Sequence, residues 1–364
     1  MRSMVVALLL LSMAMPAGAQ TPAPSQPKAA PKPSVTKTKT SVEGVAANRS
    51  TGRDTTIVGE LRVEAIALKP LTKTPAVQAF LDSTRALPFP GMRTLYMDST
   101  RSHLYTESQA RALGDEAKAK LLSRTLDDKF YYNTRYGTPL AYARPLDLVA
   151  QQGVKSFAGW HIVDFGYGGI GQLRLLASLG ANVVGVDVDP LLPVLYSQPG
   201  DQGAVPGRGG KIMLVDGHFP ADSSVAARVG GGYDLFLSKN TLKHGYIHPT
   251  RPADKRQLVD LGVDDSAFVV AVRNVLKPGG YAMIYNLSPA MSKPDQPYRP
   301  WTDGHDPFPR SLWENTGFEV IAYDQVDDEA ARAMGKALRW DEGDNGMSLD
   351  ADLFGRYTLV RKKK

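Results

Sequence analysis

The sequence predicts an α/β protein with a seven-stranded, mostly parallel sheet, helices on both faces of that sheet, and a helical leading region before it. Seven short β-rich runs follow Trp160, six of them alternate with helical or turn segments, and a Gly-rich turn follows the first run. Strands separated by helices form right-handed βαβ units, which bury a parallel sheet between two helical layers. A chain of 364 residues, 43% of them hydrophobic, is long enough to bury such a core.

The first nineteen residues have the pattern of an export signal. A basic residue precedes an apolar run over residues 4–13, and small residues follow at 17–19. At roughly ten residues the run is too short to cross a bilayer as a helix. We therefore expect residues 1–19 to be a cleaved signal peptide, with no stable membrane insertion afterwards, and the protein to be periplasmic or secreted. An uncleaved signal or a misassigned start would make it cytoplasmic.

Residues 20–56 are rich in Pro, Ala, Ser, Thr and Lys, with almost nothing apolar to bury. This composition predicts a disordered tether. The chain has no cysteine, which excludes a disulfide framework and a lipid-modified cysteine.

The basic charge lies mainly at the two ends of the chain. The net charge is +6, but residues 1–56 hold seven basic and two acidic residues and the last four residues are all basic, which leaves −3 for residues 57–360. The charge of the folded part therefore gives no support to a nucleic-acid-binding face.

Helical signals mark the leading region, residues 57–150. Thr74 before Pro75 is typical of a helix N-terminus, and Thr106 and Gln109 have capping-box spacing. An apolar stripe at helical spacing follows, formed by Leu113, Ala117, Leu121, Leu126 and Phe130. The tyrosines at 131, 132, 136 and 142 then surround Gly137-Thr138-Pro139. They predict either the lid of a pocket or packing of this region on the sheet.

The expected strands come in order along the rest of the chain. They cover residues 161–165, 182–188, 211–216, 233–238, 281–286, 318–324 and 353–361. The seventh follows the sixth without a helix of ordinary βαβ size, so we expect it to insert antiparallel beside the sixth.

The Gly-rich turn after the first strand is a candidate nucleotide-binding site. Gly166, Gly168 and Gly171 match the pattern G-x-G-x-x-G, and Asp187 ends the next strand about twenty residues later. Glycines let a backbone approach a ligand, and the helix N-terminus supplies N–H donors. Alone, this pattern favours NAD and an NAD-dependent oxidoreductase.

The residues around the turn favour another cofactor, because the sequence resembles the class I S-adenosylmethionine-dependent methyltransferases. Asp164 stands two residues before Gly166, where that family has an acid and a dinucleotide enzyme usually has an apolar residue. The resemblance implies a Rossmann-like fold and S-adenosyl-L-methionine as cofactor. It also implies that Asp187 binds the ribose and that Asp216, in LVDG, lies near the adenine.

Later segments extend the resemblance to residues 130–361. Residues 233–244, YDLFLSKNTLKH, are similar to the family's fourth-strand motif. Residues 276–286 carry a Lys-Pro-Gly-Gly turn before the fifth strand, and LWENTGFEVIAYD with LFGRYTLVRK is similar to its closing antiparallel pair.

The turn departs from the family pattern D-x-G-x-G-x-G at Ile170, which occupies the last glycine position. A side chain there either narrows the cofactor site or shifts the turn by one residue. This departure leaves open an exported, methyltransferase-like binding protein without turnover.

Candidate acceptor-side residues follow the fourth strand. Methyl transfer requires an aligned acceptor and, for a weakly acidic acceptor, a base. His244 is the candidate base, because imidazole titrates near neutrality, although a histidine there often only packs or caps. Lys239 and Asn240 are candidates for orienting the acceptor.

The long segment between the fifth and sixth strands, residues 288–313, is Pro-rich and carries Asp303 and His305. It is a candidate for substrate selection, or else a surface loop. His244 and His248 have the spacing of two metal ligands on a helix, but Gly245 and Pro249 interrupt the helix, so we expect no metal. The sequence thus predicts an S-adenosylmethionine-dependent methyltransferase for a small molecule or an envelope component.

Overall fold

The computed structural model describes residues 56–134, 137–207, 209–344 and 346–364. The predicted signal peptide, the tether up to residue 55, and Tyr136 therefore lie outside the described residues. From residue 56 onward the described chain belongs to one compact unit.

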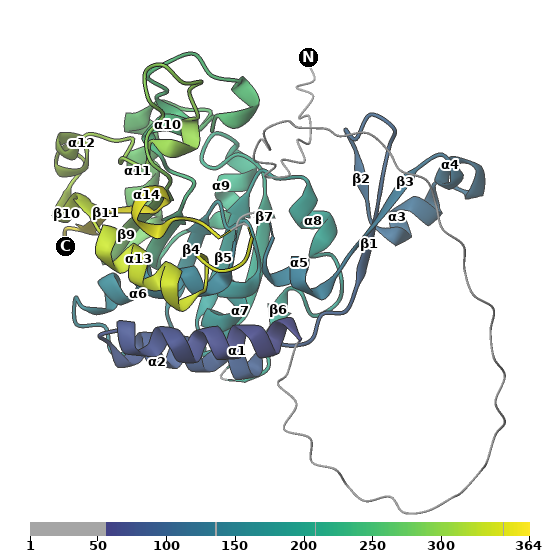
Figure 1. Ribbon diagram of the computed structural model, residues 1–364, viewed down its shortest axis with the longest axis horizontal. Helices are drawn as coiled ribbons and strands as arrows, with labels where there is room; N and C mark the ends of the chain where they lie inside the picture. The colour runs from purple at the N-terminus through teal and green to yellow at the C-terminus, as the bar shows by residue number, and fades with distance from the viewer. Residues whose placement is uncertain (1–55, 135–136, 208, 345) are drawn as a thin grey trace, which may run out of the picture. The chain divides into compact units, whose positions relative to one another are not determined.

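An eight-stranded sheet forms the centre of this unit (Figure 1). The strand order is β10-β11-β9-β8-β4-β5-β7-β6. The strands are β4 (His161–Phe165), β5 (Asn182–Asp187), β6 (Gly203–Ala204), β7 (Lys211–Asp216), β8 (Tyr233–Lys239), β9 (Leu276–Ser288), β10 (Phe318–Val326) and β11 (Phe354–Lys362). All seven predicted strands are present, and β6 is a two-residue addition at one edge.

Pairing within the sheet confirms the mostly parallel arrangement. β4 pairs in parallel with β5 and β8, β5 with β7, and β8 with β9. β11 pairs antiparallel with both β9 and β10, so the expected insertion of the last strand beside the sixth is confirmed. In β9, residues 277–280 form a bulge between the partners of Tyr233 and Leu235, where the Lys-Pro-Gly-Gly turn was expected.

Helices cover both faces of the sheet. Consecutive residues of β8 alternate between two hydrophobic clusters, with Leu235 and Leu237 in one and Phe236 in the other, as the twofold period of a strand requires. The first cluster includes residues of α1, α2, α6, α7 and α13, and the second includes residues of α9, α11 and α12. Their bounds are α1 (Ile57–Leu68), α2 (Pro75–Asp82), α6 (Ala143–Ala150), α7 (Gly171–Ser178), α9 (Ser223–Val229), α11 (Asp265–Val275), α12 (Arg310–Asn315) and α13 (Asp328–Ala337).

Shorter helices connect these elements. The α-helices are α3 (Glu107–Ala112), α4 (Asp115–Ala119), α5 (Asp128–Tyr132), α8 (Leu191–Leu195), α10 (His244–Ile247) and α14 (Leu349–Asp352). The 3₁₀ helices are η1 (Lys69–Leu71), η2 (Ser83–Ala86), η3 (Pro139–Tyr142), η4 (Lys255–Gln257) and η5 (Pro300–Thr302). None of the helices in the described part of the chain has the length and apolarity to cross a membrane.

The leading region is only partly helical. Between α2 and α6 it also contains an antiparallel sheet of order β2-β1-β3, formed by β1 (Arg93–Met97), β2 (Leu104–Tyr105) and β3 (Leu122–Leu126) (Figure 1). The predicted capping box is present, because Thr106 accepts from the Gln109 backbone and Gln109 accepts from that of Thr106. The continuous helix predicted beyond it is wrong, since Gly114 has a φ of +85° and residues 122–126 pair with β1.

Buried charges join the small sheet to the main one. Arg93 of β1 donates to Asp201 at 2.7 Å, and Arg174 of α7 approaches the same carboxylate at 3.4 Å. The Tyr131 hydroxyl donates to it at 2.7 Å. Tyr131, Tyr132 and Tyr142 are all buried, so these three predicted tyrosines pack the leading region against the sheet.

Candidate functional site

The Gly-rich turn leads from β4 into α7 and contacts the end of β5. Gly166 and Gly168 have φ values of +72° and +57°, which favour glycine. The Gly168 N–H donates to Asp187 Oδ2 at 3.0 Å, while Val188 and Asp189 donate their N–H groups to Oδ1. The predicted acid at the end of the second strand therefore holds the turn in place.

Two of the glycines are also required by neighbouring side chains. A Cβ on Gly166 would lie 2.0 Å from the Thr241 hydroxyl oxygen, and one on Gly171 would lie 2.7 Å from carbons of Pro139. Gly166 thus allows β4 and the segment after β8 to approach each other. Gly171 begins α7 and packs closely against Pro139 of η3, and its predicted approach to the cofactor stays a prediction.

Ile170 is a core residue. Its side chain is fully buried in the first hydrophobic cluster, and its backbone forms the N-cap of α7. Of the two interpretations of this departure, the structure favours a turn displaced by one residue, because the side chain packs with the core.

Asp164 lies buried beneath the turn. It accepts from Gln172 at 3.0 Å and from the Tyr142 hydroxyl at 3.4 Å. Burial raises the pKa of Asp164 to about 7, although these two hydrogen bonds oppose the shift. Lys239, at the end of β8, is also buried, and its ammonium lies 5.3 Å from the centre of the Tyr142 ring. Burial lowers the pKa of Lys239 to about 8, and the charge of Asp164 opposes that shift.

Two carboxylates lie side by side at the ends of adjacent strands. Asp187 and Asp216 are partners in the parallel register of β5 and β7. Asp187 is half-buried and Asp216 is exposed. Burial raises the pKa of Asp187 to about 6, and it also raises that of Asp216. This pair presents hydrogen-bond acceptors beside the Gly-rich turn.

Asn240 has a structural role. Its φ is +65°, its N–H donates to Tyr285 O at 3.0 Å, and its side-chain oxygen accepts from the Leu287 N–H at 2.7 Å. This oxygen holds the end of β9, and the predicted role of the side chain in orienting an acceptor stays a prediction.

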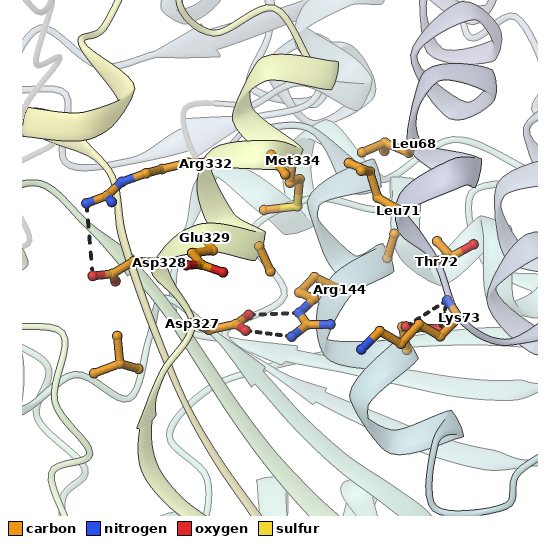
Figure 2. Close-up of a pocket in the computed structure, with 15 residues that line it drawn as sticks. Leu68, Leu71, Thr72, Lys73, Arg144, Asp327, Asp328, Glu329, Arg332 and Met334 are labelled. Carbon is orange, nitrogen blue, oxygen red and sulfur yellow. Dashed lines mark hydrogen bonds and ion pairs between the residues drawn. The ribbon is translucent and has the colours of Figure 1, made fainter.

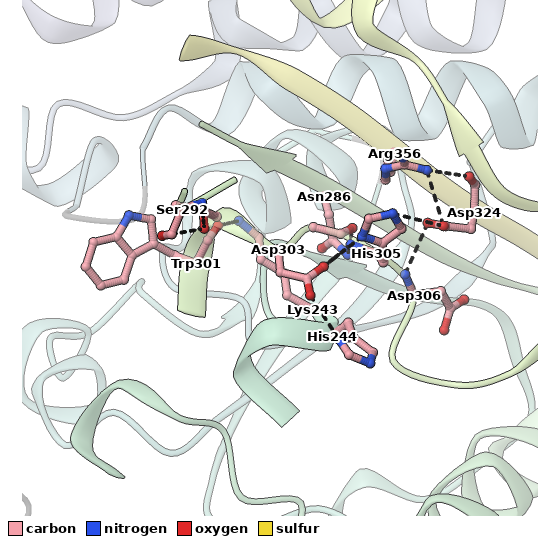
Figure 3. Close-up of polar contacts among 12 residues, drawn as sticks. Lys243, His244, Asn286, Ser292, Trp301, Asp303, His305, Asp306, Asp324 and Arg356 are labelled. Carbon is pink, nitrogen blue, oxygen red and sulfur yellow. Dashed lines mark hydrogen bonds and ion pairs between the residues drawn. The ribbon is translucent and has the colours of Figure 1, made fainter. Parts of the chain in front are cut away.

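His244 and the predicted substrate residues come together around one carboxylate (Figure 3). Asp303 Oδ2 lies 2.9 Å from His244 Nδ1, and Asp303 Oδ1 lies 2.7 Å from His305 Nδ1. Asp303 is 4% exposed, whereas the two imidazoles are about one-third exposed. Burial alone would raise the pKa of Asp303, but the hydrogen bonds from His305 and His244 lower it to about 2.

The long segment after β9 therefore contacts the end of β8. Lys243 is buried and donates from Nζ to Leu287 O at 2.5 Å and to Trp301 O at 3.2 Å. A Cβ on Gly245 would lie 2.1 Å from Pro300 O. Burial, and next the charge of Lys239, lower the pKa of Lys243 to about 7. The segment therefore lies beside His244, and its role in substrate selection stays a prediction.

Three further residues of this cluster were not predicted. Asp324 of β10 and Arg356 of β11 form an ion pair at 3.2 Å, and Asp324 faces His305. Asp324 lies on the edge strand β10 and Arg356 on its neighbour β11, and these two residues have no local sequence signal. Lys243 directly precedes His244, so its position in the fourth-strand motif was the sequence signal that could have placed it in the site.

His248, the second histidine of the H-x-x-x-H spacing, contacts a different carboxylate from His244. The rings of His244 and His248 are 5.7 Å apart, but His248 Nε2 bonds to Asp265 at 2.9 Å while His244 bonds to Asp303. The two imidazoles thus turn toward different aspartates.

A cavity of about 720 Å³ lies elsewhere, between η1, α6 and α13 (Figure 2). Its described lining residues include none of those predicted for the site. On its wall, Arg144 donates to both oxygens of Asp327, at 2.8 and 2.5 Å, and Tyr285 donates to the same carboxylate at 3.0 Å. These contacts join α6 to the end of β10, so we assign this ion pair a structural role and place the candidate site at the strand ends.

Comparison with known proteins gives similarities of structure. No family model matches the chain, and no curated protein matches it. The magnesium protoporphyrin IX methyltransferase of Synechocystis is 16% identical, with 64% of this chain and 82% of that chain covered and a TM-score of 0.33. The 1,6-didemethyltoxoflavin-N1-methyltransferase of Burkholderia thailandensis is 16% identical, with 60% and 76% covered and a TM-score of 0.33. The [4+2]-cyclase SpnF is 17% identical, with 60% and 80% covered and a TM-score of 0.34.

The strand order, rather than these similarities, assigns the fold. Numbered by their order among the seven predicted strands, the main strands run 6-7-5-4-1-2-3, with an antiparallel seventh strand between the fifth and sixth. A dinucleotide-binding domain has the order 3-2-1-4-5-6 without that insertion. The fold is that of the class I S-adenosylmethionine-dependent methyltransferases.

Proposed function

We propose that this protein is an S-adenosylmethionine-dependent methyltransferase whose acceptor is a small molecule or an envelope component. The observation that carries the proposal is the antiparallel β11 between β9 and β10, because it separates this sheet from that of NAD-dependent oxidoreductases. Fold alone does not fix an activity, so the site must supply the chemistry.

The residues at the strand ends fit this cofactor. Asp187 keeps acceptor capacity beyond its three backbone N–H donors, because a carboxylate has about four lone-pair sites. Asp216 is exposed beside it. Asp187 would accept from the ribose hydroxyls, Asp216 would lie near the adenine, and the backbone at Gly166 and Gly168 would border the ligand. When bound, the cofactor supplies an electrophilic methyl group on a sulfonium.

His244 is suited to remove a proton from the acceptor. Its Nδ1 faces Asp303 at 2.9 Å, which places the Nδ1 proton on that side and leaves Nε2 as the basic nitrogen in the neutral ring. Asp303 is anionic and buried, so it also stabilises the imidazolium that forms when Nε2 takes a proton.

Binding in solution tests the proposal. The chain from residue 20 onward is titrated calorimetrically with S-adenosylmethionine, S-adenosylhomocysteine and NAD. We expect the first two to bind with micromolar affinity. Tight binding of NAD alone would contradict the proposal, and silence from all three ligands in a folded protein would favour the binding-protein alternative.

Replacing the ribose acceptor gives the sharper test. Asp187→Ala is expected to weaken binding of S-adenosylmethionine by about 1–3 kcal/mol, because it removes a charged acceptor from the ribose hydroxyls. Asp222→Ala is the matched control, since Asp222 likewise accepts from backbone N–H groups, of Ser224 and Val225, but at the start of α9. Equal affinities in the two variants would overturn the role of Asp187, and urea unfolding of both separates binding from stability.

Export is the second part of the proposal. The pattern of residues 1–19 supports a cleaved signal. Cell fractionation of a C-terminally tagged chain, with N-terminal sequencing, should find it outside the cytoplasm and beginning near residue 20. An intact N-terminus on a cytoplasmic protein would contradict export.

A further inference from the structure

His305 shares the Asp303 carboxylate with the proposed base. Each carboxylate oxygen serves one imidazole, Oδ2 at 2.9 Å from His244 and Oδ1 at 2.7 Å from His305 (Figure 3). The His305 backbone N–H also approaches Oδ1, at 3.3 Å. The orientation of the carboxylate toward His244 therefore depends on His305 as well.

The far side of the His305 ring also faces protein. Its Nε2 lies 3.8 Å from Asp324 Oδ2, and Asp324 in turn bonds to Arg356 Nη1 at 3.2 Å and accepts from the Asp306 N–H at 3.2 Å. The hydrogen bond to Asp303 is the largest cause that raises the pKa of His305. Because both ring nitrogens are turned toward carboxylates, His305 is poorly placed for the acceptor contact that the sequence predicted.

We infer that His305 is a positioning residue: it holds Asp303 in the orientation that keeps the His244 proton on Nδ1 and leaves Nε2 as the basic nitrogen, and its charge acts on His244 through that shared carboxylate. The positive charge of a protonated His305 partly cancels the electrostatic effect of the Asp303 carboxylate on His244. The part that concerns catalysis rests on the proposed function, whereas the coupling between the imidazoles does not.

Several ionisable groups surround the two imidazole rings, and their charges also act on the rings. Around His244 they are Lys243, His248 with its partner Asp265 of α11, and Asp303; around His305 they are Asp303, Asp324 of β10 and Arg356 of β11. Among these groups, Asp303 is bonded to both imidazoles.

Histidine NMR tests the coupling directly, because the chain has six histidines. In His305→Gln the pKa of His244 is expected to rise by roughly 0.5–1 unit, because the variant removes a positive charge bonded to the carboxylate that His244 also contacts. The ¹⁵N shifts should also show weaker preference for the Nδ1–H form of neutral His244. His103, which bonds to Asp98 in the small sheet, is the internal reference and should not move.

His248→Gln is the matched control. Its ring lies within 5.7 Å of His244 but bonds to a different carboxylate, so its effect on the pKa of His244 should be smaller than that of His305→Gln. An unchanged His244 titration and tautomer in His305→Gln would overturn the inference, as would an equal shift in both variants. In an Asp303→Asn background, His305→Gln and His248→Gln should no longer differ in their effect on the pKa of His244.

Turnover gives a separate readout. If the methyltransferase assay is positive, the acid limb of the pH profile of kcat should move to higher pH in His305→Gln, by the same amount as the NMR titration. A protein that binds no S-adenosylmethionine would remove the proposed function but leave the NMR result interpretable. A shifted NMR titration with an unshifted kcat profile would overturn the catalytic part of the inference.

Discussion

Asn240 shows how a single position after β8 is constrained. Its φ of +65° is a left-handed conformation that asparagine tolerates better than most residues, and its side chain holds the Leu287 N–H at 2.7 Å. Both Asn240→Ala and Asn240→Gly lose that hydrogen bond. Alanine also has a strained backbone there, so we expect Asn240→Ala to lower the free energy of unfolding by about 1 kcal/mol more than Asn240→Gly. Urea unfolding of the two variants measures the difference, and equal stabilities would exclude backbone strain at this position.

At the same scale, local sequence patterns predict candidate site residues but not the partners of those residues. His244, Asp303 and His305 were each predicted from local context, and the structure brings them together. Their shared carboxylate could not be predicted, because 59 residues separate His244 from Asp303 and no local period relates them. Asn240 and Gly171 show a second limit of the sequence, since their residue types predicted a ligand site but not their contacts with the Leu287 backbone and with Pro139.

At the scale of elements, the Arg144–Asp327 pair joins α6 to the end of β10. Its two side chains are 17% and 7% exposed, and the shortest N–O distance is 2.5 Å. Arg144→Ala leaves the buried Asp327 carboxylate without its charged partner, so we expect the free energy of unfolding to fall by about 3–5 kcal/mol.

An exposed ion pair with a similar N–O distance provides the control. Arg361 and Glu319 join β11 and β10 at 2.6 Å but are 44% and 51% exposed, so Arg361→Ala should cost at most about 1 kcal/mol. Chemical unfolding of both variants compares the two costs. Equal losses would mean that burial does not decide the strength of the Arg144–Asp327 contact.

Elements differed in how well the sequence predicted them. The central strands β4, β5 and β8 carry β-rich runs that are mostly buried, so composition agrees with the fold there. The prediction of one continuous helix after Thr106 was wrong, although the apolar spacing there is compatible with a helix. Gly114 interrupts the helix, and residues 122–126 pair with β1. Tertiary pairing decided the structure there, and no local pattern reveals a partner strand thirty residues earlier.

At the scale of the whole molecule, buried ionisable groups give the stability an unusual pH dependence. Burial raises the pKa of Asp164 and of Asp306 to about 7, and it lowers the pKa of Lys239 to about 8 and that of Lys243 to about 7. Between about pH 4 and 7 the unfolded chain ionises these carboxylates before the folded one does, so stability falls as pH rises. From about pH 7–8 to 10.5 the lysines stay protonated only in the unfolded chain, so stability rises with pH. We therefore expect the free energy of unfolding, measured with urea at constant ionic strength, to have a minimum between pH 7 and 8; a maximum there would contradict this account.

Asp306 allows one contribution to that curve to be isolated. Its side chain is 7% exposed, with Oδ1 accepting from the Phe308 N–H at 2.8 Å and Oδ2 buried without a hydrogen-bond partner among the described residues. Asp306→Asn keeps the shape and the acceptor but cannot ionise. Below pH 4 the free energy of unfolding should change with pH almost equally in the variant and the wild type. Between pH 5 and 7 the free energy of unfolding of the wild type should fall by up to about 1.4 kcal/mol more per pH unit than that of the variant. The comparison uses urea unfolding at pH 5, 6 and 7. Parallel curves would show that Asp306 ionises in the folded protein as readily as in water, and the minimum would then have to come from Asp164 and the two lysines.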